Sequence, residues 1–250
     1  MQIFWSAMDS LSLLRFYDAV GIGEAYGDKP FNFLDYSMPK ILSPVSGVDD
    51  AGTPRAVMAV ADLVAEAEQA VAACASVSEL DKAVLDMRDL PLAKLAMNAV
   101  VGRGSVSPEI LAITEIPTSW DDRTGEFMRD ADGDMLSRIL GAMKRSVETD
   151  AYAMPAIPFR PAGGRMPTEE EAMIMRPFLL RRIELLKPSL IVSFGALAVR
   201  MLFGDMRPIT EMQGKMLDLG GIPVMPVFSV PFMMSNADAK RETWNSIKSL

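Results

Sequence analysis

Residues 109–140 read EILAITEIPTSWDDRTGEFMRDADGDMLSRIL, and this stretch decides the fold. Its first part, 109–114, is an apolar run that is long enough for a buried strand and too short for a helix. A polar loop with three carboxylates is predicted over 115–125. From residue 132 the apolar positions recur at helical spacing, and they are Met135, Leu136, Ile139, Leu140 and Met143. Because open α/β sheets bind ligands beyond the carboxyl ends of their strands, the loop 115–125 is the first candidate for a functional site.

Length and composition are those of a folded protein. The chain has 250 residues, half of them hydrophobic, which fits one domain or one domain with an appendage. Residues 1–10 lack the basic start of a secretory signal, and the long apolar stretches are all interrupted by charges. The single cysteine, Cys74, excludes an intramolecular disulfide and is expected to be a buried apolar side chain rather than a reactive thiol. These features predict a cytoplasmic protein without a membrane span.

Charge limits the partners that the chain is expected to bind. A net charge of −8 argues against a general nucleic-acid binder, because Lys and Arg contacts to phosphates supply most non-specific affinity. Residues 151–250 hold 12 Lys or Arg against 9 Asp or Glu, so an anionic partner is expected to meet this half. The chain has no histidine, the usual acid or base near neutral pH and the commonest metal ligand. Its 20 methionines are expected to be core filler, and no metal site is predicted.

Apolar runs and helical patterns alternate along the second half of the chain. Strands are predicted at 109–114, 151–159, 189–193 and 224–230. Helical segments lie between them, and one begins at Thr168 with the capping pattern TEEE. Strands that alternate with helices favour a parallel sheet with right-handed crossovers and helices on both faces. The predicted fold class is therefore α/β, with three α/β/α layers around a central, mostly parallel four-stranded sheet.

The N-terminal third reads differently. A helix is predicted over 9–20, followed by a linker rich in Pro, Gly and Ser over 37–54. A strongly patterned helix over 55–75 and a short helix ending near Met87 come next. We therefore expect a helical extension with its linker at 1–85 and the main domain at 86–250.

Seven motifs, taken in order, resemble those of the family 4 uracil-DNA glycosylases. The first is TEIPT at 114–118 with Asp121, Asp122 and Gly125 after it, which is similar to the family's GEAPG…ED…G. The others are YAMPAIPFRP at 152–161, GGRMPT at 163–168 with Glu171, PFL at 177–179, KPSLIV at 187–192, FGALA at 194–198 and VFSVPFMM at 227–234. The resemblance covers roughly 109–250 and implies the family's fold. The extension at 1–85 resembles the helical arm and linker that many bacterial homologues carry.

At the base-pocket positions this sequence departs from the family that it resembles. The family's phenylalanine, which stacks on the extruded uracil, aligns with Met128, and Phe127 stands one residue earlier. Its base-reading asparagine aligns with Pro155, which has no side-chain donor or acceptor. Its histidine, which stabilises charge on the uracil ring, aligns with Val230. Together with Pro117 of the first motif, these residues are the predicted lining of the base pocket.

The family's iron–sulfur cluster is not expected here. Its cysteines align with Leu90 or a neighbour, with Phe159 and with Met175, and a fourth ligand has no counterpart. A cluster of this kind needs about four thiolates, and the chain has one. No cofactor is therefore predicted.

The positions that keep acidic residues are the catalytic candidates. Glu115, Asp121 and Asp122 remain in the first motif, where a carboxylate could orient a water or stabilise an oxocarbenium-like sugar. The alternative is a solvated acidic loop with a helix cap.

Two basic residues and one helix start are the predicted phosphate contacts. These are Arg160, Arg165 and the helix start at Gly195. The alternative is that the arginines form ion pairs that hold a loop to the domain.

Three functions are compatible with these residues. The first is a uracil-DNA-glycosylase-superfamily protein, related to base-excision DNA repair, that is degenerate and acts by binding or as a structural protein, with weak affinity for single-stranded or damaged DNA. The second is an active glycosylase that uses Asp121 or Asp122 on uracil or another deaminated base. The third, a nucleotide- or phosphate-binding α/β protein, is disfavoured because no glycine-rich phosphate loop occurs. Whether the chain is an enzyme stays open at this point, and the sequence names no protein partner.

Overall fold

The computed structural model describes residues 60–87, 90–204 and 207–248. These residues belong to one unit by their contacts, Met58–Leu250. The helix predicted over 9–20 and the linker predicted over 37–54 lie outside the described residues.

Six strands form one sheet in the order β1-β3-β2-β4-β6-β5. The four central strands are parallel, and each edge strand pairs antiparallel with its neighbour. Their bounds are β1 Arg103–Gly104, β2 Ile110–Thr114, β3 Ala151–Pro155, β4 Leu190–Phe194, β5 Leu217–Leu219 and β6 Ile222–Val227. The α/β class is confirmed, but the predicted strand number of four is wrong. The two edge strands have only two and three residues, too few to give an apolar run.

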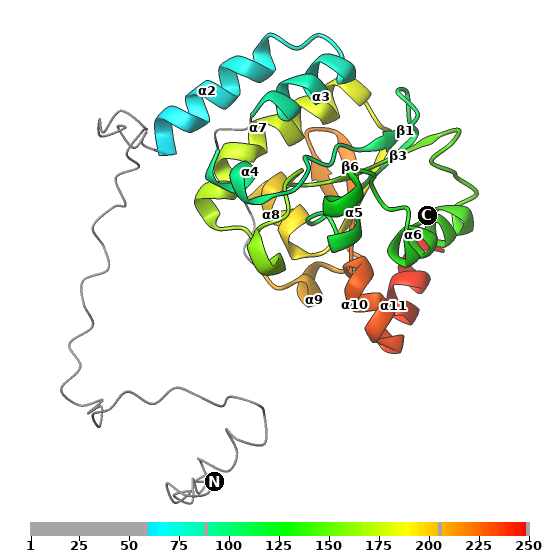
Figure 1. Cartoon of the computed structure of the whole chain (residues 1–250). Helices are drawn as coiled ribbons and strands as arrows, with labels where there is room; N and C mark the ends of the chain where they lie inside the picture. Colours follow the sequence, from blue (N-terminus) through cyan, green and yellow to red (C-terminus); the bar gives the residue numbers. More distant parts are fainter. Residues whose placement is uncertain (1–59, 88–89, 205–206, 249–250) are drawn as a thin grey trace, which may run out of the picture. The chain divides into compact units, whose positions relative to one another are not determined.

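Helices cover both faces of the sheet, as the three-layer prediction requires (Figure 1). On one face α7 and α8 pack with the N-terminal helices α2, α3 and α4, and on the other α6, α10 and α11 pack together. The longer helices are α2 Val60–Ala72, α3 Val77–Asp86, α6 Ala131–Ala142, α7 Glu169–Leu186, α8 Ala196–Phe203 and α11 Ala237–Ile247. The shorter ones are α4 Pro91–Leu95, α5 Ser119–Thr124, α9 Ile209–Met212 and α10 Val230–Ser235.

The side chains of β2 point alternately to the two faces of the sheet, and each face has its own hydrophobic core. Leu111 and Ile113 belong to the core cluster on the α7 face, and Ile110 and Ala112 belong to the cluster on the α6 face. Since successive strand residues point to opposite faces, a buried strand with helices on both sides must be apolar throughout. The apolar run that decided the fold class is therefore the central strand of a sheet buried on both sides.

Helices α2 and α3 pack against α7. Asp81 of α3 forms an ion pair of 2.5 Å with Arg182 of α7, whose other amino group donates to the Tyr152 hydroxyl at 2.8 Å. Arg181 donates two hydrogen bonds to the carbonyl oxygen of Cys74, which follows α2. These contacts tie residues 60–86 to the sheet-bearing part of the chain. The boundary predicted at residue 85 stays a prediction.

Three local predictions change. The strand predicted over 151–159 is shorter, because β3 ends at Pro155. The stretch 115–125, predicted as a loop, contains helix α5. The strand predicted over 224–230 ends at Val227, and α10 begins at Val230 with Pro231 in its first turn, where the missing N–H of proline costs nothing.

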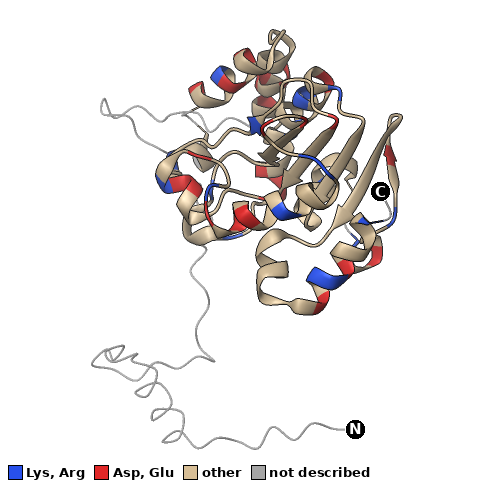
Figure 2. Cartoon of the chain, turned by 90° about the vertical axis from the view of Figure 1, so that its right-hand side faces the viewer, with Lys and Arg blue, Asp and Glu red and all other residues tan. Residues whose placement is uncertain are grey.

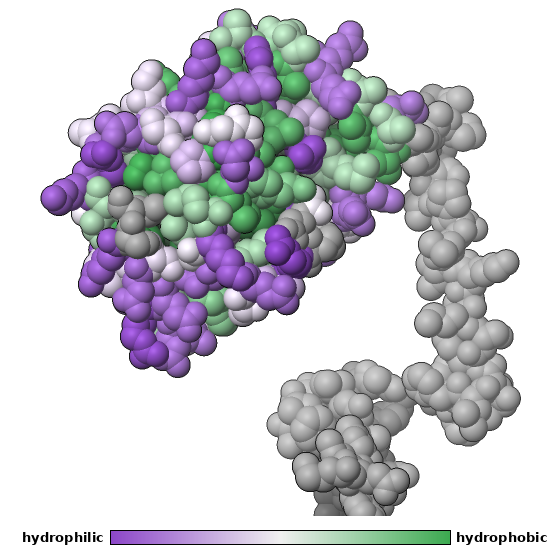
Figure 3. Space-filling view, turned by 180° about the vertical axis from the view of Figure 1, so that it is seen from behind, coloured by the Kyte–Doolittle hydropathy of each residue, from purple (hydrophilic) through white to green (hydrophobic). Residues whose placement is uncertain are grey.

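Charged residues lie mainly on the helices and loops, and the strands are almost free of them (Figure 2). Seen from behind, apolar residues gather in the middle of the face, with hydrophilic residues around them (Figure 3). Within the described residues, no helix is long and apolar enough to cross a membrane.

Candidate functional site

The four parallel strands end at one edge of the sheet. Thr114 of β2 is paired with Pro155 of β3, and Phe194 of β4 is paired with Val227 of β6. The segments that follow β2, β4 and β6 carry Glu115, α5, Gly195 and α10. Parallel sheets place their ligand sites at this edge, and the structure brings most of the predicted site residues there.

Glu115 lies against the N-terminus of α8. Its carboxylate accepts a hydrogen bond of 3.0 Å from the backbone N–H of Leu197. Gly195 has a φ of 94°, and a Cβ there would stand 2.3 Å from the Glu115 Cδ, so this close approach requires glycine. Burial raises the pKa of Glu115, and the N–H groups of Leu197 and Ala196 offset part of that rise. The helix N-terminus predicted to take a phosphate is therefore occupied by the chain's own carboxylate.

Asp121 is a helix cap. One of its oxygens accepts from the Thr118 N–H at 2.8 Å, and the other accepts from the Met128 N–H at 2.8 Å. The Thr118 hydroxyl accepts in turn from the Asp121 N–H, which completes a capping box at the start of α5. Asp121 is fully buried. Burial raises its pKa, while hydrogen bonds from Thr118 and Met128 lower it and the nearby Asp130 raises it further. The cap interpretation left open by the sequence matches these contacts, although the residue is buried rather than solvated.

Asp122 holds the segment that precedes β1. Its carboxylate accepts from the backbone N–H groups of Met97, at 2.9 Å, and Asn98, at 3.3 Å. The Asn98 amide donates to the Asp122 carbonyl oxygen at 2.6 Å. All three candidate carboxylates therefore receive hydrogen bonds from the chain's own backbone.

Three of the predicted pocket residues are packed rather than open. Phe127 and Met128 are each 2% exposed and Val230 is 1% exposed, and all three belong to the core cluster on the α6 face. Pro117 and Pro155 are also buried. Phe127, Met128 and Val230 therefore all belong to one large cluster of buried apolar side chains, and their role as the lining of a base pocket stays a prediction.

Thr114 is a residue that the sequence reasoning did not single out. It stands where the resembled motif has glycine, it is 4% exposed, and its hydroxyl has no hydrogen-bond partner within the part of the chain that the structure describes. By strand alternation it shares the sheet face of Ile110 and Ala112, which is the face of Phe127 and Met128. The mismatch between TEIPT and the family's GEAPG was the available signal.

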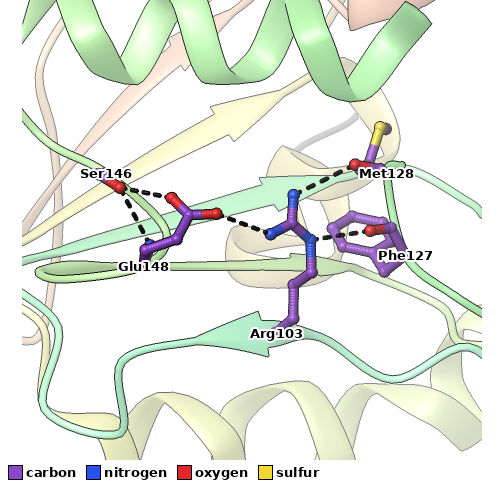
Figure 4. Close-up of polar contacts among 5 residues, drawn as sticks. All are labelled: Arg103, Phe127, Met128, Ser146 and Glu148. Atoms are coloured by element: carbon purple, nitrogen blue, oxygen red, sulfur yellow. Dashed lines mark hydrogen bonds and ion pairs between the residues drawn. The ribbon is translucent and has the colours of Figure 1, made fainter. Parts of the chain in front are cut away.

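Arg103 on β1 is a second residue that was not predicted from the sequence. It holds the Phe127–Met128 turn (Figure 4). Its guanidinium donates to the carbonyl oxygens of Phe127, at 2.9 Å, and Met128, at 3.2 Å. It also lies 3.5 Å from the Glu148 carboxylate, which accepts a hydrogen bond from the Ser146 hydroxyl. Met128 has a φ of 49°, which is unusual for a residue other than glycine. The hydrogen bonds from Arg103 therefore help to hold this turn in its unfavourable backbone conformation. A lone arginine in a glycine-containing segment gives no sequence signal.

The two arginines predicted to contact phosphates have partners within the chain. Arg160 donates to the Pro117 carbonyl oxygen at 2.6 Å. Arg165 forms two hydrogen bonds with the Glu171 carboxylate, at 2.7 and 2.8 Å, and these lower the pKa of Glu171. The Arg165 contact is an ion pair, as in the alternative interpretation, whereas Arg160 contacts a backbone carbonyl oxygen rather than a carboxylate. The Arg165 side chain is 43% exposed, so it reaches a phosphate only in competition with Glu171.

The positions aligned with cluster cysteines do not fit an iron–sulfur cluster. Leu90, Phe159 and Met175 are at most 6% exposed and share one core cluster, which offers apolar side chains and no thiolate set. The one cysteine, Cys74, is buried near the end of α2, and its thiol donates to the Ala70 carbonyl oxygen. Among the described residues, no group of three or more His, Cys, Asp or Glu could hold a metal ion. The absence of a cofactor stays a prediction.

The fold and the motif positions define a class of protein. A family model described as the uracil DNA glycosylase superfamily matches residues 101–248. That match covers more than half of the chain, and the chain belongs to this superfamily.

Several named relatives are type-4 uracil-DNA glycosylases. A type-4 uracil-DNA glycosylase of Thermotoga maritima is 33% identical over 150 residues, which cover 58% of this chain and 77% of that protein. One from Saccharolobus solfataricus is 30% identical over 122 residues, covering 49% of this chain and 56% of that protein. A third, from Archaeoglobus fulgidus, is 28% identical over 148 residues, covering 58% and 74%. The predicted similarity to family 4 is confirmed.

Proposed function

We propose that this superfamily member has little or no uracil-excising activity and acts as a DNA-binding or structural protein related to base-excision repair. The relationship to type-4 uracil-DNA glycosylases favours DNA as the ligand class. The contacts at the sheet edge argue against efficient excision.

The observation that carries the proposal is the packing of Phe127, Met128 and Val230. Each is at most 2% exposed within one apolar cluster. A uracil entering this position must displace these side chains and bury its carbonyl and imide groups among them. Each polar group buried without a partner costs about 1–3 kcal/mol, which offsets the roughly 1–3 kcal/mol gained by stacking a base on an aromatic side chain.

A second observation supports the same conclusion. Glu115, Asp121 and Asp122 each accept hydrogen bonds from backbone N–H groups of the chain. A general base must reach a water or the reacting proton at hydrogen-bond distance. Asp121 is fully buried and both of its oxygens are already engaged, so activating a water there requires the start of α5 to rearrange.

The active-enzyme alternative has one observation in its favour. Asp121 and Asp132 have raised pKa values, mainly because of burial, and Asp130 contributes to both. Carboxylates with perturbed pKa values are typical of active sites, although structural clusters show them as well. This alternative predicts release of a deaminated base that depends on Asp121 or Asp122.

An excision assay separates the two functions. The purified chain is incubated with end-labelled single-stranded oligonucleotides that carry one uracil, hypoxanthine or xanthine, and abasic products are cleaved with alkali and counted. We expect no abasic product above the background of a thymine control. Product that disappears in Asp121→Asn or Asp122→Asn would establish the active-enzyme alternative. Product of equal amount in the wild type and both variants would instead point to Glu115 or to a contaminating enzyme, and a Glu115→Gln variant separates these two sources.

Weak binding to DNA is the remaining part of the proposal. Arg165 is partly exposed, and the C-terminal half carries a small excess of positive charge. Contacts of this kind act on phosphates and lose affinity steeply as salt rises. Arg165→Gln should therefore weaken binding to single-stranded DNA and lower its salt dependence, with fluorescence anisotropy as the measurement. Binding that does not change with salt would contradict phosphate contacts.

A further inference from the structure

Helices α6, α10 and α11 form a groove beside the candidate site, and nothing in the proposed function uses it. The groove has two adjoining hollows of about 230 Å³ and 430 Å³. Both are lined by Met135 and Arg138 of α6, Met233 of α10 and Lys240 of α11. The same helices pack on one face of the sheet and against one another, so three helices form the walls.

The narrower hollow has an apolar floor. Met135, Ile139 and Met233 line it at low exposure, and Trp244 closes it with a side chain that is 36% exposed. Its volume of about 230 Å³ lies below the roughly 300–1,000 Å³ of pockets for drug-sized ligands. Methionine side chains adapt to differently shaped partners and are frequent on surfaces that bind peptides. The hollow therefore fits one large apolar side chain better than a cofactor.

Cations border the apolar floor from two sides. Arg138 of α6 and Lys240 of α11 are exposed, and no ion pair to either is formed within residues 60–248 as far as the structure describes them. Lys248 adds a third cation, with its Nζ 5.6 Å from the centre of the Trp244 ring. Among the described residues that line the two hollows, Asp134 is the one with a carboxylate, and it lines the wider hollow and not the narrower one. The charge at the mouth of the narrower hollow complements an anionic ligand.

Thr243 gives an independent indication of a ligand. It lines the narrower hollow, it is 1% exposed, and its hydroxyl has no hydrogen-bond partner among the described residues. A buried polar group without a partner is costly and rare in folded proteins. A ligand that brings one donor or acceptor into the hollow would satisfy it.

The lining distinguishes an anionic peptide from a nucleotide. A nucleobase carries several donors and acceptors around its edge, whereas the uncharged side chains that line the narrower hollow offer two N–H or O–H groups, the Thr243 hydroxyl and the Trp244 indole N–H. The other edge groups of a base would remain without partners. An acidic peptide with one apolar side chain buries no unpaired polar groups in the hollow. Its carboxylates stay outside the hollow, near Arg138 and Lys240. We propose that the α6–α10–α11 groove binds an acidic segment of a partner protein through one large apolar side chain.

Short model peptides test this directly. The probe is a fluorescein-labelled, N-acetylated peptide of Asp and Ser with a single Phe, titrated with the full chain and followed by fluorescence anisotropy. Two further peptides replace the Phe by Ser or every Asp by Lys. We expect saturable binding of the first peptide alone, weakened by added salt.

Charge reversal on the surface locates the site. Arg138→Glu combined with Lys240→Glu should weaken the acidic Phe peptide at least about tenfold. The matched control is Arg241→Glu, an exposed residue of α11 that does not line the groove. The control should leave the affinity within about twofold of the wild type.

Three results would overturn the inference. They are the absence of saturable binding by the acidic Phe peptide, an equal loss in the Arg241→Glu control, and binding that persists in the Arg138→Glu/Lys240→Glu variant. An oligothymidylate that binds the wild type, loses affinity in that variant and outcompetes the peptide would reassign the groove to nucleic acid.

Discussion

Replacing Phe159 by alanine tests whether hydrophobic packing has taken over the place of a metal cluster. Phe159 follows β3, forms an isolated antiparallel bridge with Ala99 and is 1% exposed. It belongs to the same core cluster as Leu90 and Met175, at the positions where the resembled family has cysteines.

The expected loss follows from burial and from the cavity left behind. Burying a phenylalanine side chain completely contributes about 1.5–3 kcal/mol. Surroundings that relax only in part add a cavity cost, so that Phe→Ala changes in cores cost about 3–5 kcal/mol in total. At about 2–4 °C per kcal/mol for a chain of this size, the melting temperature should fall by roughly 6–20 °C.

Urea and thermal unfolding followed by circular dichroism measure this loss. Phe232→Ala is the matched control, because Phe232 is 45% exposed and its ring contact with Phe228 is the interaction it loses. The control should cost no more than about 1.5 kcal/mol. A loss below about 1 kcal/mol for Phe159→Ala, or equal losses for both variants, would refute the packing argument.

Three further substitutions test individual contacts. The pKa of Glu115 is raised in the folded chain from its ordinary 4.5, so the contribution of Glu115 to folding stability is complete below pH 4.5 and is lost as pH rises through the raised folded value. Relative to Glu115→Gln, the wild type should therefore lose stability with rising pH. A difference between the two proteins that stays constant with pH in urea titrations would contradict this. Asp81→Ala leaves the Arg182 side chain, which is 4% exposed, without its carboxylate and should cost about 3 kcal/mol. Asp81→Leu combined with Arg182→Met should recover only part of that loss in the same unfolding assay, because the buried Tyr152 hydroxyl then loses its hydrogen bond from Arg182. Arg103→Gln removes the guanidinium from the 127–128 turn and should lower the free energy of unfolding by about 2–3 kcal/mol. Hydrogen exchange of the backbone amides at that turn should become faster, and unchanged exchange would show that the turn keeps its conformation without Arg103.

The fold was predictable from the sequence because its main elements have strong periodic signals. The four parallel strands are apolar runs buried on both faces, and the capping pattern at Thr168 marks the start of α7. The edge strands β1 and β5 were missed because strands this short are defined by their pairing partners rather than by their own residues.

The candidate site was only partly predictable. Resemblance to a family located Glu115, Asp121 and Val230 at one sheet edge, but it did not indicate how each side chain is engaged. The capping box at α5 had a sequence signal, Thr118 followed by Asp121 three residues later, which fits the pattern of a helix start. The role of Arg103 had none, because its partners are backbone carbonyl oxygens 24 and 25 residues away.

The most direct test of the central claim compares the affinity of the chain for uracil-containing and thymine-containing single-stranded DNA of otherwise equal sequence. Fluorescence anisotropy supplies the dissociation constants for the two DNAs, each at low and at high salt. Because Met128, Pro155 and Val230 provide no side-chain hydrogen bonds to a base, we expect equal, weak affinities that fall together as salt rises. A preference for uracil that persists at high salt would show that the pocket reads the base and would contradict the loss of uracil recognition.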